Sequence, residues 1–176
     1  MSGFCLQCDV PRPCRCFDGA SRLSATVGTI TAFLDKGGLE PFCEVHPNLF
    51  LGDLRAALPP LRDRFDVVIS ALDDKELFEV VKPDLAIEMD DAESQNVGPA
   101  VEQVCEYLRN VKDGRRVLIH CLEGRSRSVA LMAGYLILER KMSLSAAMTK
   151  IRDVRPRIRP QESFLKQLAD IQQQRM

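Results

Sequence analysis

Short apolar runs alternate with amphipathic stretches along the chain from about residue 42 onwards. The runs are the length of buried strands and fall at 66–70, 85–89 and 117–120. Between them, apolar residues recur at helical spacing in 75–81, 97–111, 143–154 and 160–171. Strands that alternate with helices favour an α/β fold with a central, mainly parallel twisted sheet of about four to five strands, flanked by helices.

The boundaries of these elements are marked by turn and capping residues. Residues 43–51 are predicted to be extended, with Gly52-Asp53 as the turn that follows. Ser143 is placed to cap one helix, and Pro160 to open the last one. Residues 129–138 are apolar almost all round, which predicts a central buried helix.

The first 40 residues differ from the rest. Residues 1–20 are rich in Cys and Pro, and a lead-in helix is predicted after them, ended by Gly37-Gly38. We therefore divide the chain into an N-terminal segment, 1–40, and a main domain, 41–176. The helix has an apolar stripe formed by Leu23, Val27, Ile30, Phe33 and Leu34.

Composition narrows the class of protein. A chain of 176 residues with 45% hydrophobic residues suits one domain with a sizeable core. A net charge of −1 argues against a nucleic-acid partner, and no apolar run is long enough for a membrane span. Without an export signal, the seven cysteines are expected to be reduced thiols in a cytoplasmic, or also nuclear, protein.

Four of the cysteines leave a metal option open. Their spacing, within twelve residues, could hold one Zn²⁺ tetrahedrally, although zinc sites usually separate their two pairs further. The alternative is a flexible tail with incidental thiols, and we otherwise predict no metal and no cofactor. The four are Cys5, Cys8, Cys14 and Cys16.

The most informative stretch runs from His120 to Ser128, between an apolar run and the central helix. Cys121 stands at the predicted strand end, and Arg127 opens the helix. Backbone N–H groups between them lack helical partners, so the loop is suited to bind an anion. The positive field of these N–H groups and of the helix N-terminus also favours the thiolate form of Cys121. A thiolate at the floor of a phosphate cradle, with a guanidinium above it, is suited to attack phosphorus. The predicted phosphate-binding residues are Leu122, Glu123, Gly124, Arg125, Ser126 and Arg127.

In this form, with His before the Cys, Gly within the loop and Ser after the Arg, the stretch resembles the signature loop of dual-specificity phosphatases, a branch of the cysteine-based protein tyrosine phosphatases. The resemblance extends over roughly 43–171 and is closest to compact, MAP-kinase-phosphatase-like members. One departure is Gln161, where many relatives carry Asn. The resemblance implies a phosphatase-type fold and a phosphocysteine on Cys121. A buried structural Cys with two solvated arginines is the alternative.

A general acid is needed to protonate the leaving oxygen, and it should come from another segment. The polar stretch 88–96 lies between a predicted strand and a helix. The family pattern laid on this stretch puts the acid at Asp91, with Asp90 and then Glu93 as alternatives. Each of these could instead be a solvated carboxylate, or a cap for the helix that begins near residue 97.

Two further roles concern residues beside the nucleophile. The resemblance implies that the Ser128 hydroxyl assists departure of the Cys121 sulfur, although it could merely satisfy a first-turn N–H. His120 is expected to hold the loop rather than to transfer protons, or to be an ordinary core residue.

The expected substrate is a phosphoprotein, with MAP kinases among the candidates, bearing phosphotyrosine, phosphoserine or phosphothreonine. No tyrosine-recognition loop precedes residue 43, and no lysines stand in the signature loop to favour inositol phosphates. The rival functions are a phosphoprotein-binding module without activity, a phosphatase of a non-protein ester and a sulfurtransferase. The sequence leaves the oligomeric state open.

The last expectation concerns redox protection of the nucleophile. Cys43 begins an extended segment that could lie beside the strand ending at Cys121, so it is a candidate partner for a disulfide, ahead of Cys105. The alternative is that Cys43 is a small buried hydrophobe.

Overall fold

The computed structural model describes residues 19–38 and 40–174, and it divides into two compact units, 1–39 and 40–176. In the first unit, helix α1 (Gly19–Lys36) ends before Gly37-Gly38, as the sequence predicts. The zinc hypothesis for Cys5, Cys8, Cys14 and Cys16 lies outside the described residues.

The second unit contains a five-stranded sheet in the order β1-β2-β5-β3-β4. Three of its four strand pairings are parallel, and only β1 and β2 are antiparallel, so the predicted fold class is confirmed. β3 and β5 are apolar and buried throughout, as expected for inner strands of a parallel sheet. The strands are β1 (Phe42–His46), β2 (Leu49–Gly52), β3 (Val67–Leu72), β4 (Leu85–Glu88) and β5 (Val117–His120).

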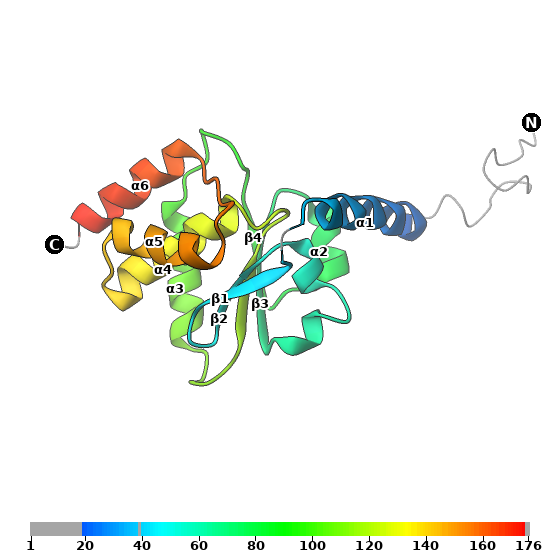
Figure 1. Cartoon of the computed structure of the whole chain (residues 1–176), viewed down its shortest axis with the longest axis horizontal. Helices are drawn as coiled ribbons and strands as arrows, with labels where there is room; N and C mark the ends of the chain where they lie inside the picture. The colour runs from blue at the N-terminus through cyan, green and yellow to red at the C-terminus, as the bar shows by residue number, and fades with distance from the viewer. Residues whose placement is uncertain (1–18, 39, 175–176) are drawn as a thin grey trace, which may run out of the picture. The chain divides into compact units, whose positions relative to one another are not determined.

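Helices cover both faces of this sheet (Figure 1). Helices α3 to α6 gather on one side, where α4 contacts three strands, whereas α2 packs on β3 from the other side. The two 3₁₀ turns are η2 (Leu54–Ala57) and η3 (Arg62–Arg64). The helices are α2 (Lys75–Val81), α3 (Gly98–Arg109), α4 (Arg127–Arg140), α5 (Leu144–Val154) and α6 (Glu162–Gln173).

The central helix is α4, which is buried along its first twelve residues, as its apolar sequence predicts. Gly134 lets it approach α3 closely, because a Cβ at this position would lie 2.5 Å from the Val101 side chain. Since α4 begins at Arg127, its packing fixes where the end of the Cys121 loop lies.

Two expectations about boundaries need correction. The extended stretch 43–51 is a hairpin of two strands, because Asn48 adopts a left-handed backbone (φ 62°) and turns the chain. The chain does turn after β2, as predicted, because Asp53 caps η2 and its side chain accepts from the Arg55 N–H. The last helix begins at Glu162 rather than Pro160, with Gln161 at the N-cap position.

The prediction that Cys43 lies beside the strand of Cys121 is wrong. Cys43 lies on β1, and β2 separates β1 from β5, so the Cys43 strand is not beside the strand that ends at Cys121. Two strand spacings amount to about 10 Å, whereas a disulfide needs Cα atoms within about 7 Å. Burial also raises the pKa of the Cys43 thiol, although Arg155 opposes this effect. The fold therefore favours the interpretation of Cys43 as a small, partly buried hydrophobe.

No helix among the described residues is long and apolar enough to cross a membrane.

Candidate active site

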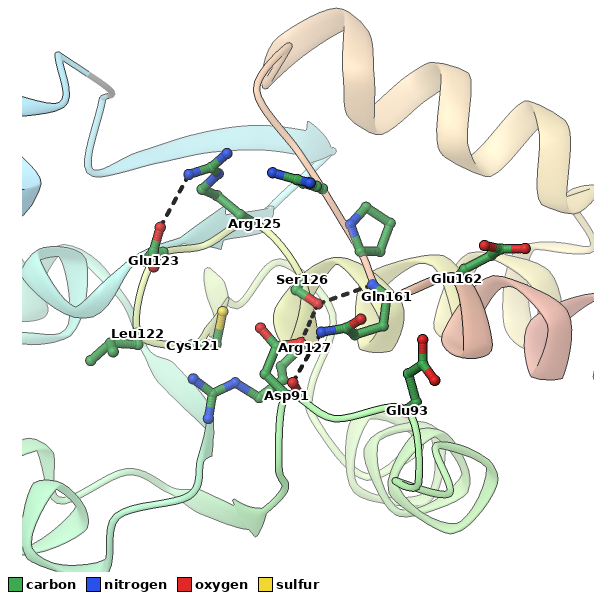
Figure 2. Close-up of a pocket in the computed structure, with 12 residues that line it drawn as sticks. Asp91, Glu93, Cys121, Leu122, Glu123, Arg125, Ser126, Arg127, Gln161 and Glu162 are labelled. Atoms are coloured by element: carbon green, nitrogen blue, oxygen red, sulfur yellow. Dashed lines mark hydrogen bonds and ion pairs between the residues drawn. The ribbon is translucent and has the colours of Figure 1, made fainter.

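A cavity of about 580 Å³ opens at the carboxyl end of β5, where the strand passes into the Cys121 loop. Figure 2 shows Cys121, Arg127 and Asp91 converging on it from the loop, from α4 and from the β4–α3 connection. Of the predicted phosphate-binding residues, all but Gly124 line the cavity: Leu122, Glu123, Arg125, Ser126 and Arg127. Gly124 belongs to the same loop but does not line the cavity, and Ser128 is the second residue of α4.

The loop between Cys121 and Arg127 is held from outside through its carbonyl groups. The carbonyl oxygen of Leu122 accepts from the Leu54 N–H at 3.1 Å, and that of Arg125 accepts from the Arg159 N–H at 2.8 Å. The two carbonyls between them are bound by one side chain, which is described next. Within the described residues, no backbone N–H from 122 to 126 donates a hydrogen bond, so these donors are available to an anion.

That side chain is Arg155, which follows α5 and is only 3% exposed. Its Nε donates to the Gly124 carbonyl at 2.7 Å, and one Nη donates to the Glu123 carbonyl at 3.3 Å. Its charge is balanced by the fully buried Asp53, 3.5 Å away. Asp53 is also paired with Arg55 at 2.8 Å, so the buried carboxylate has two cationic partners.

Gly124 is the one loop position at which only glycine fits. Its φ of +65° lies in the left-handed region, where a side chain is strained. A Cβ there would also lie 2.6 Å from both the Arg155 guanidinium and the Gly52 carbonyl oxygen. The glycine thus permits the close approach through which Arg155 holds the loop.

Cys121 is buried at the floor of the cavity, 2% exposed. Its Sγ lies 3.2 Å from the Ser128 Oγ, a distance at which the hydroxyl can donate to sulfur. Directly before it, His120 is fully buried, with Nδ1 at 3.2 Å from the Cys121 carbonyl oxygen and Nε2 at 2.5 Å from the Ser70 Oγ. Burial, helped by the nearby charge of Arg127, lowers the pKa of His120 to about 4. The imidazole is therefore neutral near pH 7, and its hydrogen bond to Ser70 links β5 to β3.

Arg127 reaches the cavity from the first turn of α4 and is 4% exposed. One Nη donates to the Asp73 carboxylate at 2.8 Å and to the Met89 carbonyl oxygen at 3.2 Å. Its Nε is buried and has no hydrogen-bond partner among the described residues. Burial opposes the charge, but Cys121, Asp73 and Asp91 hold the pKa of Arg127 above its usual value. Arg127 thus brings a positive charge to the wall of the cavity, where it is suited to bind an oxyanion.

The three candidate acids lie at different places. Asp91 and Glu93 line the cavity, whereas Asp90 does not. The Asp91 Oδ1 accepts from the Ser126 Oγ at 2.6 Å, which ties this carboxylate to the Cys121 loop. Asp91 does not cap α3, because the Gly98 N–H is bound by the Asn96 side chain at 3.1 Å. This geometry distinguishes Asp91 from both alternatives.

Sequence reasoning missed two residues of this site and one contact. Asp73 stands directly after β3, which is parallel to β5, so it lies at the same sheet edge as Cys121. Its position soon after a predicted strand could have marked Asp73 as a candidate site residue. Arg155 lies in a stretch that resembles the family, but its role could not be read from the sequence, since its contacts join residues 31 to 115 positions apart. The bond from Ser126 to Asp91 could not be read from the sequence either.

The described residues contain no group of three or more His, Cys, Asp or Glu side chains placed to hold a metal ion.

Comparisons with known proteins point to one family. Residues 49–174 match the family model described as the dual specificity phosphatase catalytic domain. Mouse dual specificity phosphatase 28 is 30% identical over 138 residues, which cover 76% of this chain and 85% of that protein. The crystal structure of human DUSP28 superposes with a TM-score of 0.69 at 26% identity, over 77% of this chain and 95% of that chain.

Some relatives are much longer proteins. The dual specificity protein phosphatase PHS1 of Arabidopsis thaliana is 32% identical over 82 residues, which are 46% of this chain but only 9% of that protein. The family match nevertheless covers most of the present chain and contains Cys121, Arg127 and Asp91. The chain belongs to the dual specificity phosphatase catalytic-domain family, and this membership supports protein phosphatase activity.

Proposed function

We propose that the protein hydrolyses phosphotyrosine, phosphoserine and phosphothreonine in proteins through a phosphocysteine on Cys121. The observation that carries this proposal is the convergence on one cavity of a buried thiol, an arginine with an unpaired buried N–H and a carboxylate. The loop N–H groups and Arg127 would bind the three non-bridging oxygens of the phosphate.

In the first step, the Cys121 sulfur attacks phosphorus and the P–O bond to the substrate breaks. The leaving oxygen takes a proton from Asp91, so the alcohol or phenol departs neutral. Arg127 would bind the phosphate with its guanidinium, while Asp73 and the Met89 carbonyl hold one Nη. This arrangement fixes the guanidinium plane before the substrate binds.

In the second step, water attacks phosphorus and the S–P bond breaks. Asp91, now ionised, accepts the proton of the water, which regenerates the acid. The sulfur leaves as a thiolate, and the Ser128 hydroxyl at 3.2 Å donates to it. The products are inorganic phosphate and the unmodified enzyme.

The lining of the cavity supports the breadth of the proposed substrates. Of the twelve residues that line it, only Leu122 and Pro160 are apolar, and none is aromatic. An aromatic wall would favour phosphotyrosine by stacking on its ring. Without such a wall, the recognition is dominated by the phosphate itself.

The test compares the wild type with Cys121→Ser on three peptides that differ only in carrying phosphotyrosine, phosphoserine or phosphothreonine. We expect release of phosphate from all three by the wild type, without added metal, and none by the variant, because its alcohol stays protonated. The variant should still bind the phosphopeptides. Undiminished turnover by Cys121→Ser would sink the mechanism, and release from only one peptide would sink the dual specificity.

A further inference from the structure

The loop that carries Asp91 is tied to distant parts of the chain by glutamine side chains. The Gln161 Nε2 donates to the Asp91 carbonyl oxygen at 3.0 Å. The Gln161 backbone N–H donates to the Ser126 Oγ at 3.3 Å, and this hydroxyl donates to the Asp91 carboxylate. Gln161 thus contacts both loops at the mouth of the cavity (Figure 2).

A second glutamine holds the other end of the same loop. The Gln167 side chain, on α6, donates to the Gln95 carbonyl at 2.9 Å and accepts from the Val97 N–H at 2.8 Å. Inside the loop, the Gln95 side chain accepts from the Asp90 N–H at 2.9 Å. The amides of Gln161 and Gln167 therefore fix both ends of the segment from Asp90 to Val97.

These amides matter because the segment has little else to hold it. None of the residues from 90 to 96 is buried, whereas Met89 and Val97, which flank them, are. Apolar packing therefore anchors only the two ends. The position of the carboxylate between them depends on hydrogen bonds.

We propose that Gln161 and Gln167 are positioning residues that set the reach of Asp91 over the Cys121 loop. The inference rests on the proposed function, since it requires Asp91 to be the general acid. A proton donor must lie within hydrogen-bond reach of the leaving oxygen, and a small misplacement lowers the rate strongly. The α5–α6 connection and α6 are then part of the machinery for proton transfer, and both glutamines act through Asp91.

The proposal predicts a specific signature. Loss of either amide should slow the cleavage of esters whose leaving group must be protonated, and should spare esters whose leaving group departs as a stable anion. A general loss of structure would slow both. The acid-dependent basic limb of the pH–rate profile should also flatten in the variants.

The experiment measures kcat/KM, which reports only the steps up to departure of the leaving group, for phenyl phosphate and for 2,4-dinitrophenyl phosphate with Gln161→Ala and Gln167→Ala. We expect a fall of about tenfold on the first ester and less than about twofold on the second. The matched control is Gln172→Ala, because Gln172 is also on α6 and also binds a backbone N–H, that of Leu144, away from the cavity. It should leave the ratio of the two rates unchanged.

A parallel Asp91→Asn variant separates the two levels of the argument. If Asp91→Asn shows no dependence on the leaving group, the general-acid assignment fails and this inference fails with it. If Asp91→Asn shows the dependence but Gln161→Ala and Gln167→Ala keep the wild-type ratio, the positioning role alone is overturned. In the Asp91→Asn background, Gln161→Ala should cost nothing further, and an additive loss would mean that it acts elsewhere.

Discussion

The two loops that meet at the cavity are held in opposite ways. The Cys121–Arg127 loop is bound from behind by Arg155 and flanked by His120, both almost completely buried. The Asp90–Asn96 loop has no buried residue and is held by glutamine amides. Thus the groups that bind and attack phosphate share the stability of the core, whereas the proton donor depends on contacts at the surface. Substitutions that loosen the Cys121–Arg127 loop should therefore lower the stability of the protein, whereas substitutions at the Asp90–Asn96 loop should impair proton transfer.

The largest effect is expected at Arg155. Arg155→Met removes the cation that binds two loop carbonyls and leaves Asp53 with Arg55 alone. We expect a loss of about 3–5 kcal/mol in the free energy of unfolding, as for other broken buried ion pairs, together with loss of activity. Arg109→Met is the control, because it breaks an exposed pair with Glu139 and should change the free energy of unfolding far less. Denaturant unfolding that gives equal losses would contradict the buried anchor.

Arg127→Lys tests the binding geometry rather than the stability of the same loop. Lysine keeps the charge but lacks the planar fork, so kcat should fall about 10²-fold, or about 3 kcal/mol in the barrier. Steady-state kinetics would measure it. A change below about threefold would place Arg127 away from the reacting phosphate.

Asp91→Asn tests the other loop. We expect kcat for a phosphopeptide to fall about 10- to 100-fold and the basic limb of the pH profile to flatten, with little change in unfolding. Asp90→Asn is the matched control, since Asp90 does not line the cavity. Greater damage from Asp90→Asn would show that the acid is assigned one residue too late.

The buried His120, which precedes the Cys121–Arg127 loop, should make the free energy of unfolding fall at acid pH. Its pKa of about 4 in the folded protein lies below the usual value of 6.5, so the unfolded chain takes up the proton first. The contribution of His120 to the free energy of unfolding should be fully present above about pH 6.5 and should decline as pH falls toward 4. From pH 7 to pH 5 the contribution is about 2 kcal/mol. His120→Gln should lose this part of the pH dependence, and an unchanged slope would contradict the assignment.

Cys43→Ser should have the smallest effect. Because β2 lies between Cys43 and the strand of Cys121, recovery from peroxide by dithiothreitol should be the same in variant and wild type. Inactivation that becomes irreversible only in the variant would show that the two thiols meet.

The same contrast explains what the sequence could predict. The strand, loop and helix around Cys121 follow from a local pattern of nine residues, and α/β alternation predicts the sheet. The contacts of Asp91 join residues 35 and 70 positions apart, so only a family resemblance could place it. The order of the strands in the sheet could not be predicted either. The apolar patterns of the strands do not show which strands are neighbours, so the sequence did not reveal that β2 lies between Cys43 and β5. Asp73 was within reach, because strand ends of a parallel sheet meet at one edge.

The most direct test is to trap the phosphoryl group on the enzyme. Ser128→Ala removes the hydroxyl 3.2 Å from the Cys121 sulfur, which should slow breakdown of the phosphocysteine more than its formation. Rapid quenching during turnover of a phosphopeptide, followed by mass spectrometry, should then find one phosphoryl group on the peptide that contains Cys121. Continued turnover with no phosphorylated Cys121, or with the phosphoryl group on another residue, would contradict the account.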